Sequence, residues 1–191
     1  MTDFLRPLST TTLADRWGLV QHHEFELRRR DGTWQRQVRE TYDSGDGAAV
    51  LLCDISAGAV VLTRQFRYPA FYRGAPALLI EACAGKLDGD TPEACVRREA
   101  LEETGYAVSR LTRAFACFVS PGAVTERVTL FVGHIDGPPS GTGGGLADEG
   151  EDIEVLHLPF ATALGMVGTG EIADAKTILL LQYAALNGVF G

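Results

Sequence analysis

The chain has 191 residues, 46% of them hydrophobic, which is enough to bury one substantial core. Seventeen lysines and arginines against 25 aspartates and glutamates give a formal net charge of −8. A general nucleic-acid binder needs a basic face to neutralise phosphates, so this charge argues against that class. It does not argue against a small phosphorylated ligand that binds through a metal ion.

The four cysteines lie inside apolar runs and form no C-x-x-C pair. We interpret them as buried, reduced thiols of a cytoplasmic protein rather than as a disulfide framework or a zinc site. The sequence shows no charged-then-apolar leader, and no apolar run approaches about 18 residues. We therefore expect neither secretion nor insertion into a membrane.

The N-terminal region is expected to form an antiparallel β-ribbon. Residues 1–21 are weakly patterned, and within them residues 10–13 could start a strand. Residues 22–30 and 34–42 are predicted to be extended, on either side of a hairpin signal at Asp31-Gly32. Both runs have a thin apolar face, and a two-stranded ribbon is marginal alone. We expect the ribbon to lie on the rest of the protein or on a second subunit, which divides the chain into residues 1–44 and 45–191.

Two arginines of the ribbon, Arg36 and Arg39, allow two interpretations. They could bind substrate phosphate, or they could form a charged strand edge that prevents unwanted pairing. From the residues alone the charged edge is the favoured interpretation.

Three strands are predicted next, at 48–55, 59–67 and 77–84, with a loop at 68–76. The second strand ends with Arg64 and Arg67, which are either solvated or placed to grip a diphosphate. The third is a continuous apolar run that contains one acid, Glu81. A buried charge needs a partner, and we expect Arg98 or another arginine.

A helix that begins after Asp90 or Thr91 and ends before Gly105 gathers three carboxylates. Helical spacing places Glu99, Glu102 and Glu103 within about a third of the circumference. Like charges so close are unfavourable, so the cluster is either a solvated acidic face or a site for a hard divalent cation such as Mg²⁺ or Mn²⁺.

After this helix, strands are predicted at 114–119, 128–135 and 153–158, and helices from Pro159 to about residue 167 and at 173–187. The glycine-rich segment 136–150 is expected to be a flexible loop. It leads to three acids before the last strand, and such a loop can close an acid onto a metal site. These acids are Glu149, Glu151 and Asp152. The elements together predict an α+β fold with a mixed β-sheet.

Residues Arg98 to Tyr106 (REALEETGY) resemble the core of the Nudix box, with every fixed position filled. Upstream, Gly85 is one residue closer to the core than in the general pattern. Similarity to the GDP-mannose pyrophosphatase branch of Nudix hydrolases, related to ADP-ribose pyrophosphatases, covers nearly the whole chain. The resemblance implies an α/β/α sandwich and a homodimer in which the N-terminal ribbon reaches the partner's site.

The resemblance also implies metal-dependent hydrolysis of a nucleoside-diphosphate sugar, GDP-mannose, to GMP and mannose 1-phosphate. The implied metal ligands are the Ala84 carbonyl, Glu99, Glu103 and Glu151, with Glu149 and Asp152 as rivals of the last. The implied catalytic residues are Arg98, Glu102, Glu103 and Glu151. The implied substrate contacts are Trp17, Gln37, Val38, Arg39, Arg67, Ala84, Gly85, Lys86, Glu103, Glu126, Glu151 and Lys176.

Two alternative functions remain open from the sequence. One is a pyrophosphatase that acts on ADP-ribose, giving AMP and ribose 5-phosphate. The other is a Nudix-fold nucleotide sensor that binds without turnover. The complete set of Arg98, Glu99, Glu102 and Glu103 argues against the sensor, because a binding module does not need the whole cluster.

Overall fold

A computed structural model describes residues 3–191. The chain forms two compact units: one contains the residues up to Asp46 together with Phe118–Arg127, and the other contains Gly47–Cys117 and Val128–Gly191. The division of the chain at residue 44 was predicted without the segment 118–127. That boundary stays a prediction.

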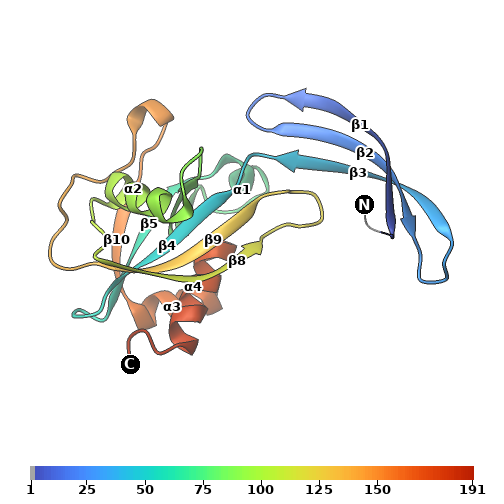
Figure 1. Cartoon of the computed structure of the whole chain (residues 1–191). Coiled ribbons are helices and arrows are strands. Elements are labelled where there is room, and N and C mark those ends of the chain that lie inside the picture. The colour runs from blue at the N-terminus through green and yellow to red at the C-terminus, as the bar shows by residue number, and fades with distance from the viewer. Residues whose placement is uncertain (1–2) are drawn as a thin grey trace. The chain divides into compact units, whose positions relative to one another are not determined.

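The N-terminal unit is built on an antiparallel sheet with strand order β1-β2-β3 (Figure 1). Its strands are β1 (Leu5–Asp15), β2 (Leu19–Arg28) and β3 (Trp34–Asp43). The hairpin between β2 and β3 was predicted, and Gly32 adopts the left-handed φ of +87° that its turn requires.

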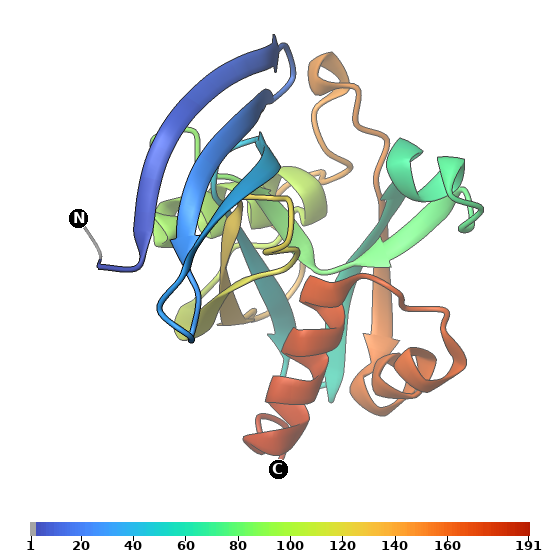
Figure 2. The ribbon, with the colours of Figure 1, turned by 90° about the vertical axis from the view of Figure 1, so that its right-hand side faces the viewer.

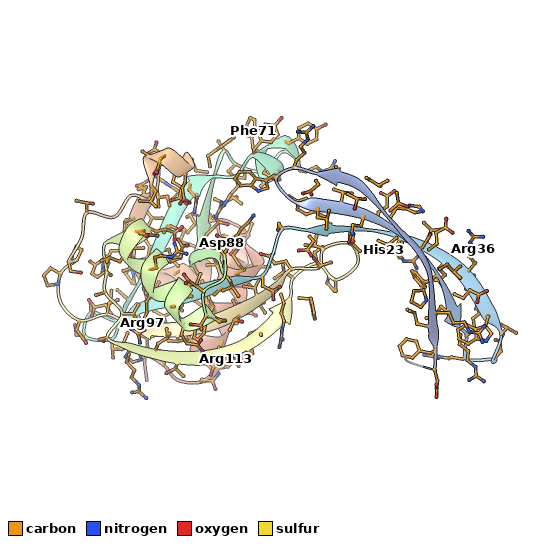
Figure 3. The ribbon with its side chains drawn as sticks, turned by 45° about the horizontal axis from the view of Figure 1, so that its top comes forward. His23, Arg36, Phe71, Asp88, Arg97 and Arg113 are labelled. Carbon is orange, nitrogen blue, oxygen red and sulfur yellow. The ribbon has the colours of Figure 1, made fainter. Side chains whose placement is uncertain are left out.

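Strand β1 is longer than the sequence indicated. Two strands of the ribbon were predicted and a further strand was only considered at 10–13, whereas the sheet has three strands. Nearly all of β1 is exposed, and its sequence does not have the alternating apolar residues that signal a strand with one buried face. A polar bridge runs across the three strands instead. The His23 ring (labelled in Figure 3) is hydrogen-bonded through Nδ1 to Thr10 Oγ1 at 3.1 Å and through Nε2 to Thr41 Oγ1 at 2.9 Å.

The segment 118–127 is attached to β3 by backbone hydrogen bonds. Tyr42 N–H donates to the Ala123 carbonyl at 2.8 Å, and Thr125 N–H donates to the Tyr42 carbonyl at 3.1 Å. A cavity of about 510 Å³ lies between this segment and β3. It is lined by Arg39, Glu40, Thr41, Phe118, Pro121, Gly122, Ala123, Val124 and Thr125.

The larger unit contains a mixed sheet with strand order β10-β5-β4-β9-β8, in which β4 and β9 are parallel. Two short strands pair outside this order, β6 with β5 and β7 with β4. The strands are β4 (Gly47–Asp54), β5 (Ala59–Phe66), β6 (Leu78–Glu81), β7 (Cys83–Lys86), β8 (Arg110–Phe118), β9 (Arg127–His134) and β10 (Glu154–Pro159).

The separation of β6 from β7 corrects the prediction of one strand at 77–84. The chain leaves β5 and joins β4 at Ala82, whose N–H donates to Thr177 Oγ1 at 2.6 Å instead of to a neighbouring strand. The predicted loop at 68–76 also contains a short helix, α1 (Tyr68–Tyr72).

Helices cover both faces of the mixed sheet, which confirms the sandwich (Figures 1 and 2). Alternate residues of β4 face opposite layers. Val50 and Leu52 pack with α2 (Pro92–Thr104), while Leu51 and Cys53 pack with α3 (Phe160–Thr169) and α4 (Ala175–Leu186). A 3₁₀ turn, Ala147–Glu149, lies in the glycine-rich loop. No helix within residues 3–191 is long and apolar enough to cross a membrane.

Candidate active site

Helix α2 has the ends that the sequence predicted. Thr91 Oγ1 accepts a hydrogen bond from the Ala94 N–H at 3.2 Å, with Pro92 in the first turn. Gly105 ends the helix with φ +76°, and its N–H donates to the Leu101 carbonyl at 3.0 Å. These caps fix the three glutamates on the last two turns.

Two of those glutamates lie against strand β7. Glu103 is buried, and its Oε2 accepts a hydrogen bond from the Ala84 N–H at 3.3 Å. Glu99 lies so close to Gly85 that a Cβ there would be 1.9 Å from Glu99 Oε1. Glycine is therefore required at position 85 by the space that the Glu99 carboxylate takes.

Arg98 holds several acids of the helix and of the turn before it. Its Nη1 is 2.9 Å from both Glu99 Oε1 and Glu102 Oε2, and its Nε is 3.5 Å from Asp90 Oδ2. The sequence predicted that Arg98 holds a carboxylate of the box in place. That role stays a prediction, and these are the carboxylates within reach of its guanidinium.

The carboxylates of Glu99 and Glu103 titrate far above the ordinary range. Burial raises the pKa of Glu99 to about 7 against the effect of Arg98, and the charges of Glu102 and Glu151 raise it further. Burial also raises the pKa of Glu103 to about 7; a hydrogen bond from the Cys83 thiol opposes this shift, and the charges of Glu99 and Glu151 add to it.

The glycine-rich loop is fastened to the end of α2. Gly144 N–H donates to the Glu103 carbonyl at 2.8 Å and Gly145 N–H to the Glu102 carbonyl at 3.1 Å. These bonds satisfy backbone carbonyls that a helix end leaves unpaired. The sequence predicted only a flexible loop, because a bond between two backbone groups leaves no signal in side-chain composition.

The loop brings Glu151 toward the other acids. Glu151 Oε2 accepts a hydrogen bond from the Leu146 N–H at 2.9 Å, and its charge contributes to the raised pKa of both Glu99 and Glu103. Of the three acids that the sequence left open as a metal ligand, Glu151 is therefore the one whose charge acts on Glu99 and Glu103. Its rivals Glu149 and Asp152 are exposed.

The chemistry of this donor set fits a hard divalent cation. Buried carboxylates that repel one another are stabilised by a multivalent ion with a preference for oxygen. Within residues 3–191, no three His, Cys, Asp or Glu side chains are grouped closely enough to hold such an ion as they stand.

Metal-free protein is expected to lose stability as the pH rises from about 4.5 to about 7. The pKa of Glu99 and of Glu103 is raised from 4.5 to about 7 in the folded protein. Folded protein therefore binds more protons than the unfolded chain in this window, and the resulting stabilisation is complete below pH 4.5 and is lost as the pH rises through 7. Thermal unfolding in EDTA between pH 4.5 and 8 measures it. Stability should depend less steeply on pH in Glu103→Gln than in the wild type. An equally steep dependence would contradict the raised pKa of Glu103.

The other predicted substrate residues divide between the two units. Trp17, Gln37, Val38, Arg39 and Glu126 belong to the N-terminal unit. The Trp17 side chain is 82% exposed, and Arg39 lines the cavity beside β3, with its Nη2 donating to Gln37 Oε1 at 3.0 Å. Arg67, Lys86 and Lys176 belong to the larger unit with the carboxylate cluster.

Glu81 is a residue whose surroundings the sequence predicted only in part. Arg98 is not its partner, because that guanidinium is taken by the acids of the box. Arg67 Nε donates to Glu81 Oε2 at 2.8 Å, and Lys176 Nζ is 3.8 Å from Glu81 Oε1. The single acid within an apolar run was the available signal, and the expectation of another arginine was right.

Comparison with known proteins identifies matches along nearly the whole chain. Residues 5–42 match a family described as the GDP-mannose pyrophosphatase NudK N-terminal domain, and residues 43–158 match the NUDIX domain. A GDP-mannose pyrophosphatase of Pectobacterium atrosepticum is 48% identical over 180 residues, which is 93% of this chain and 92% of the relative. Proteins of the same name from Yersinia pestis and Klebsiella pneumoniae are 47% and 48% identical, covering 92% and 93% of this chain and 88% and 89% of the relatives.

A solved structure shares the fold. It is described as the crystal structure of an ADP compounds hydrolase, and it superposes with a TM-score of 0.76 at 20% sequence identity. The match covers 99% of this chain and 97% of the other. At this identity the likeness supports the architecture and not a substrate.

Proposed function

Because the chain belongs to the Nudix family, we propose that it hydrolyses the diphosphate of GDP-mannose and releases GMP and mannose 1-phosphate. The observation that carries the proposal is the pair of carboxylates against β7, Glu103, which is buried, and Glu99, whose side chain is 12% exposed. The relatives named GDP-mannose pyrophosphatase match this chain over more than nine-tenths of its length. An acidic protein suits a small anionic substrate only if a cation lies between them, and this pair supplies the place for one.

The proposed metal ligands are Glu99, Glu103, Glu151 and the Ala84 carbonyl, and Mg²⁺ is the proposed ion, with Mn²⁺ as a substitute. Such an ion neutralises a diphosphate and lowers the pKa of a bound water. Arg98 keeps the Glu99 and Glu102 carboxylates oriented. Glu151 is the proposed acceptor of the proton from the attacking water, since its loop brings it to the edge of the cluster.

The remaining contacts are proposed from the chemistry of each side chain. Arg67 and Lys176 bind the diphosphate, for which paired nitrogen donors are suited. Gly85 of β7 lies against Glu99, and Lys86 follows it on the same strand. The indole of Trp17 stacks on the guanine, while Arg39, Gln37, Val38 and Glu126 complete the contacts from the N-terminal unit.

Product analysis tests the function directly. The protein is incubated with GDP-mannose and separately with ADP-ribose, each with Mg²⁺ and with EDTA, and the products are separated by chromatography. The proposal expects Mg²⁺-dependent release of GMP and mannose 1-phosphate, with ADP-ribose much slower. A preference for ADP-ribose would move the specificity but keep the mechanism. Binding of GDP-mannose without turnover would instead indicate a sensor.

A homodimer is part of the proposal, with the N-terminal unit of one protomer serving its partner's site. The exposure of Trp17, and the small apolar surface of a three-stranded sheet, support this assembly. The four free cysteines, of which Cys53, Cys83 and Cys95 are buried, support a reducing, cytoplasmic location. Cell fractionation that recovers the protein outside the cytoplasm would contradict the location.

Mixing two inactive variants tests the exchange between protomers. Glu103→Gln removes a box carboxylate and Arg39→Ala removes a contact from the N-terminal unit. If that unit serves the partner, each mixed dimer contains one intact site, and unfolding and refolding an equimolar mixture should recover about a quarter of the wild-type rate. The refolded wild type is the control. A mixture no more active than the separate variants would place both residues at a site within one protomer.

A further inference from the structure

Glu81 is a buried carboxylate to which the proposed hydrolysis assigns no task. It is the last residue of β6, and its burial is costly unless opposite charges compensate it. Each of its oxygens faces a different cation: Oε2 accepts the hydrogen bond of Arg67 Nε at 2.8 Å, and Oε1 is 3.8 Å from Lys176 Nζ. Arg67 follows β5 and Lys176 lies in the first turn of α4, so this carboxylate joins cations from two separate elements.

Asp174 holds the second cation from the other side. Lys176 Nζ donates to Asp174 Oδ1 at 2.7 Å, while Asp174 Oδ2 caps α4 by accepting from the Thr177 N–H at 2.9 Å and from Thr177 Oγ1 at 2.7 Å. Burial opposes ionisation of Asp174, but Lys176 and the bonds from Thr177 outweigh it and lower the pKa of this carboxyl group. Asp174 is thus held in its charged form.

The network is also tied to the strand that carries the proposed metal-binding backbone. Thr177 Oγ1, which is fully buried, accepts the hydrogen bond of the Ala82 N–H at 2.6 Å. Ala82 immediately precedes β7, whose residues Ala84 and Gly85 border the carboxylate cluster. The position of the two cations is therefore fixed relative to β7 by a continuous chain of hydrogen bonds and ion pairs.

The four charged groups are arranged in depth. The side chains of Glu81 and Asp174 are 5% and 11% exposed, whereas those of Arg67 and Lys176 are 42% and 21% exposed. The two acids are therefore shielded from solvent, and the two cations lie on the solvent side of them. Two cations that are oriented from behind and retain free donors form a preorganised receptor for an anion, because little side-chain entropy remains to be lost on binding.

We propose that Glu81 and Asp174 are positioning residues that hold Arg67 and Lys176 as one receptor for the diphosphate of the substrate. The assignment to a diphosphate rests on the proposed function. The acids touch no substrate atom; they set the directions in which the two cations present their donors.

Glu81→Gln is the primary test, because the amide keeps the shape of the side chain and removes its charge. We expect KM for GDP-mannose to rise at least about tenfold with kcat changed by less than about threefold, since a charge-assisted hydrogen bond is lost from the receptor and not from the reacting atoms. A merely structural role would lower the fraction of active protein, which lowers the apparent kcat and leaves KM unchanged.

Glu154→Gln is the matched control. Glu154 Oε2 accepts a hydrogen bond from Arg64 Nε at 2.7 Å, so this pair repeats the chemistry of Glu81 and Arg67. Arg64 lies on β5, three residues before Arg67, and Glu154 is exposed. Its loss should leave KM unchanged. An equal rise of KM in both variants would show a general effect of charge and would overturn the proposal.

A double-mutant cycle shows whether Glu81 acts through its cation. Arg67→Gln is measured alone and combined with Glu81→Gln. If the acid works by orienting Arg67 and Lys176, adding Glu81→Gln to Arg67→Gln should raise KM much less than it does in the wild type. Fully additive effects on KM would overturn the positioning role.

A binding measurement separates this proposal from the proposed function. Methylenediphosphonate, which has no P–O–P bond to hydrolyse, is titrated by calorimetry into metal-free wild type, Glu81→Gln and Glu154→Gln. Weaker binding by Glu81→Gln alone supports the receptor even if the wild type fails to hydrolyse GDP-mannose, in which case only the proposed function fails. If neither KM nor the affinity for this probe depends on Glu81, the positioning role is overturned.

Discussion

Glu103→Gln is expected to lower kcat for GDP-mannose by at least about 10³-fold, because loss of a proposed metal ligand removes several kcal/mol of transition-state stabilisation. The fold should survive. Burial raises the pKa of Glu103 to about 7, so the charged form is disfavoured in the metal-free protein, and a neutral amide of the same shape removes that cost. Steady-state kinetics in Mg²⁺ and thermal unfolding in EDTA measure the two effects.

Glu93→Gln serves as the control for this variant. Glu93 lies in the first turn of the same helix and is exposed, so its substitution changes the net charge of α2 equally without touching the cluster. Its rate should match the wild type. A near-normal kcat for Glu103→Gln, or an equal loss of kcat in both variants, would contradict the proposed metal site.

Gly85→Ala is expected to disable the site through a single methyl group. The added Cβ would lie 1.9 Å from Glu99 Oε1 and 2.2 Å from Glu99 Cδ, so the carboxylate must leave its place beside β7. We expect turnover to fall at least about 100-fold, since misplacement of a group by about 1 Å has that effect. The free energy of unfolding should also fall by about 1–3 kcal/mol. Kinetics and urea unfolding in the absence of metal give both quantities.

Gly165→Ala is the matched glycine substitution. Gly165 lies within α3, and nothing approaches within 4 Å of a Cβ added there. Alanine should stabilise this helix by about 0.5–1 kcal/mol and leave turnover unchanged. Wild-type activity in Gly85→Ala would mean that Glu99 functions from another position, and the proposed ligand set would have to be revised.

The carboxylate helix could be predicted from sequence because its signals are local. Thr91 and Gly105 mark the two ends, and spacings of three and four residues place the glutamates on one face. The mixed sheet followed in the same way from apolar runs bounded by turns. In these regions the residues that determine each helix or strand lie within that helix or strand or next to it in sequence.

The structural features that the sequence did not predict depend on contacts between residues that are far apart in the sequence. The step from β6 to β7 at Ala82 is set by Thr177, 95 residues later. Strand β1 is bridged to β3 through the His23 ring, and threonines give no apolar pattern to detect. The sequence named Arg98 or another arginine as the partner of Glu81. It could not single out Arg67, because that choice is made by the three-dimensional path of β5 and α2.

The fastening of the glycine-rich loop to α2 makes the two segments one cooperative unit in local unfolding. Opening the loop breaks the bonds from Gly144 and Gly145 to the carbonyls of Glu103 and Glu102, and so frays the turn that carries the acids. Hydrogen exchange at these two glycine amides should therefore be slow for so glycine-rich a segment. Their protection then reports how often the loop detaches from the turn that carries Glu102 and Glu103.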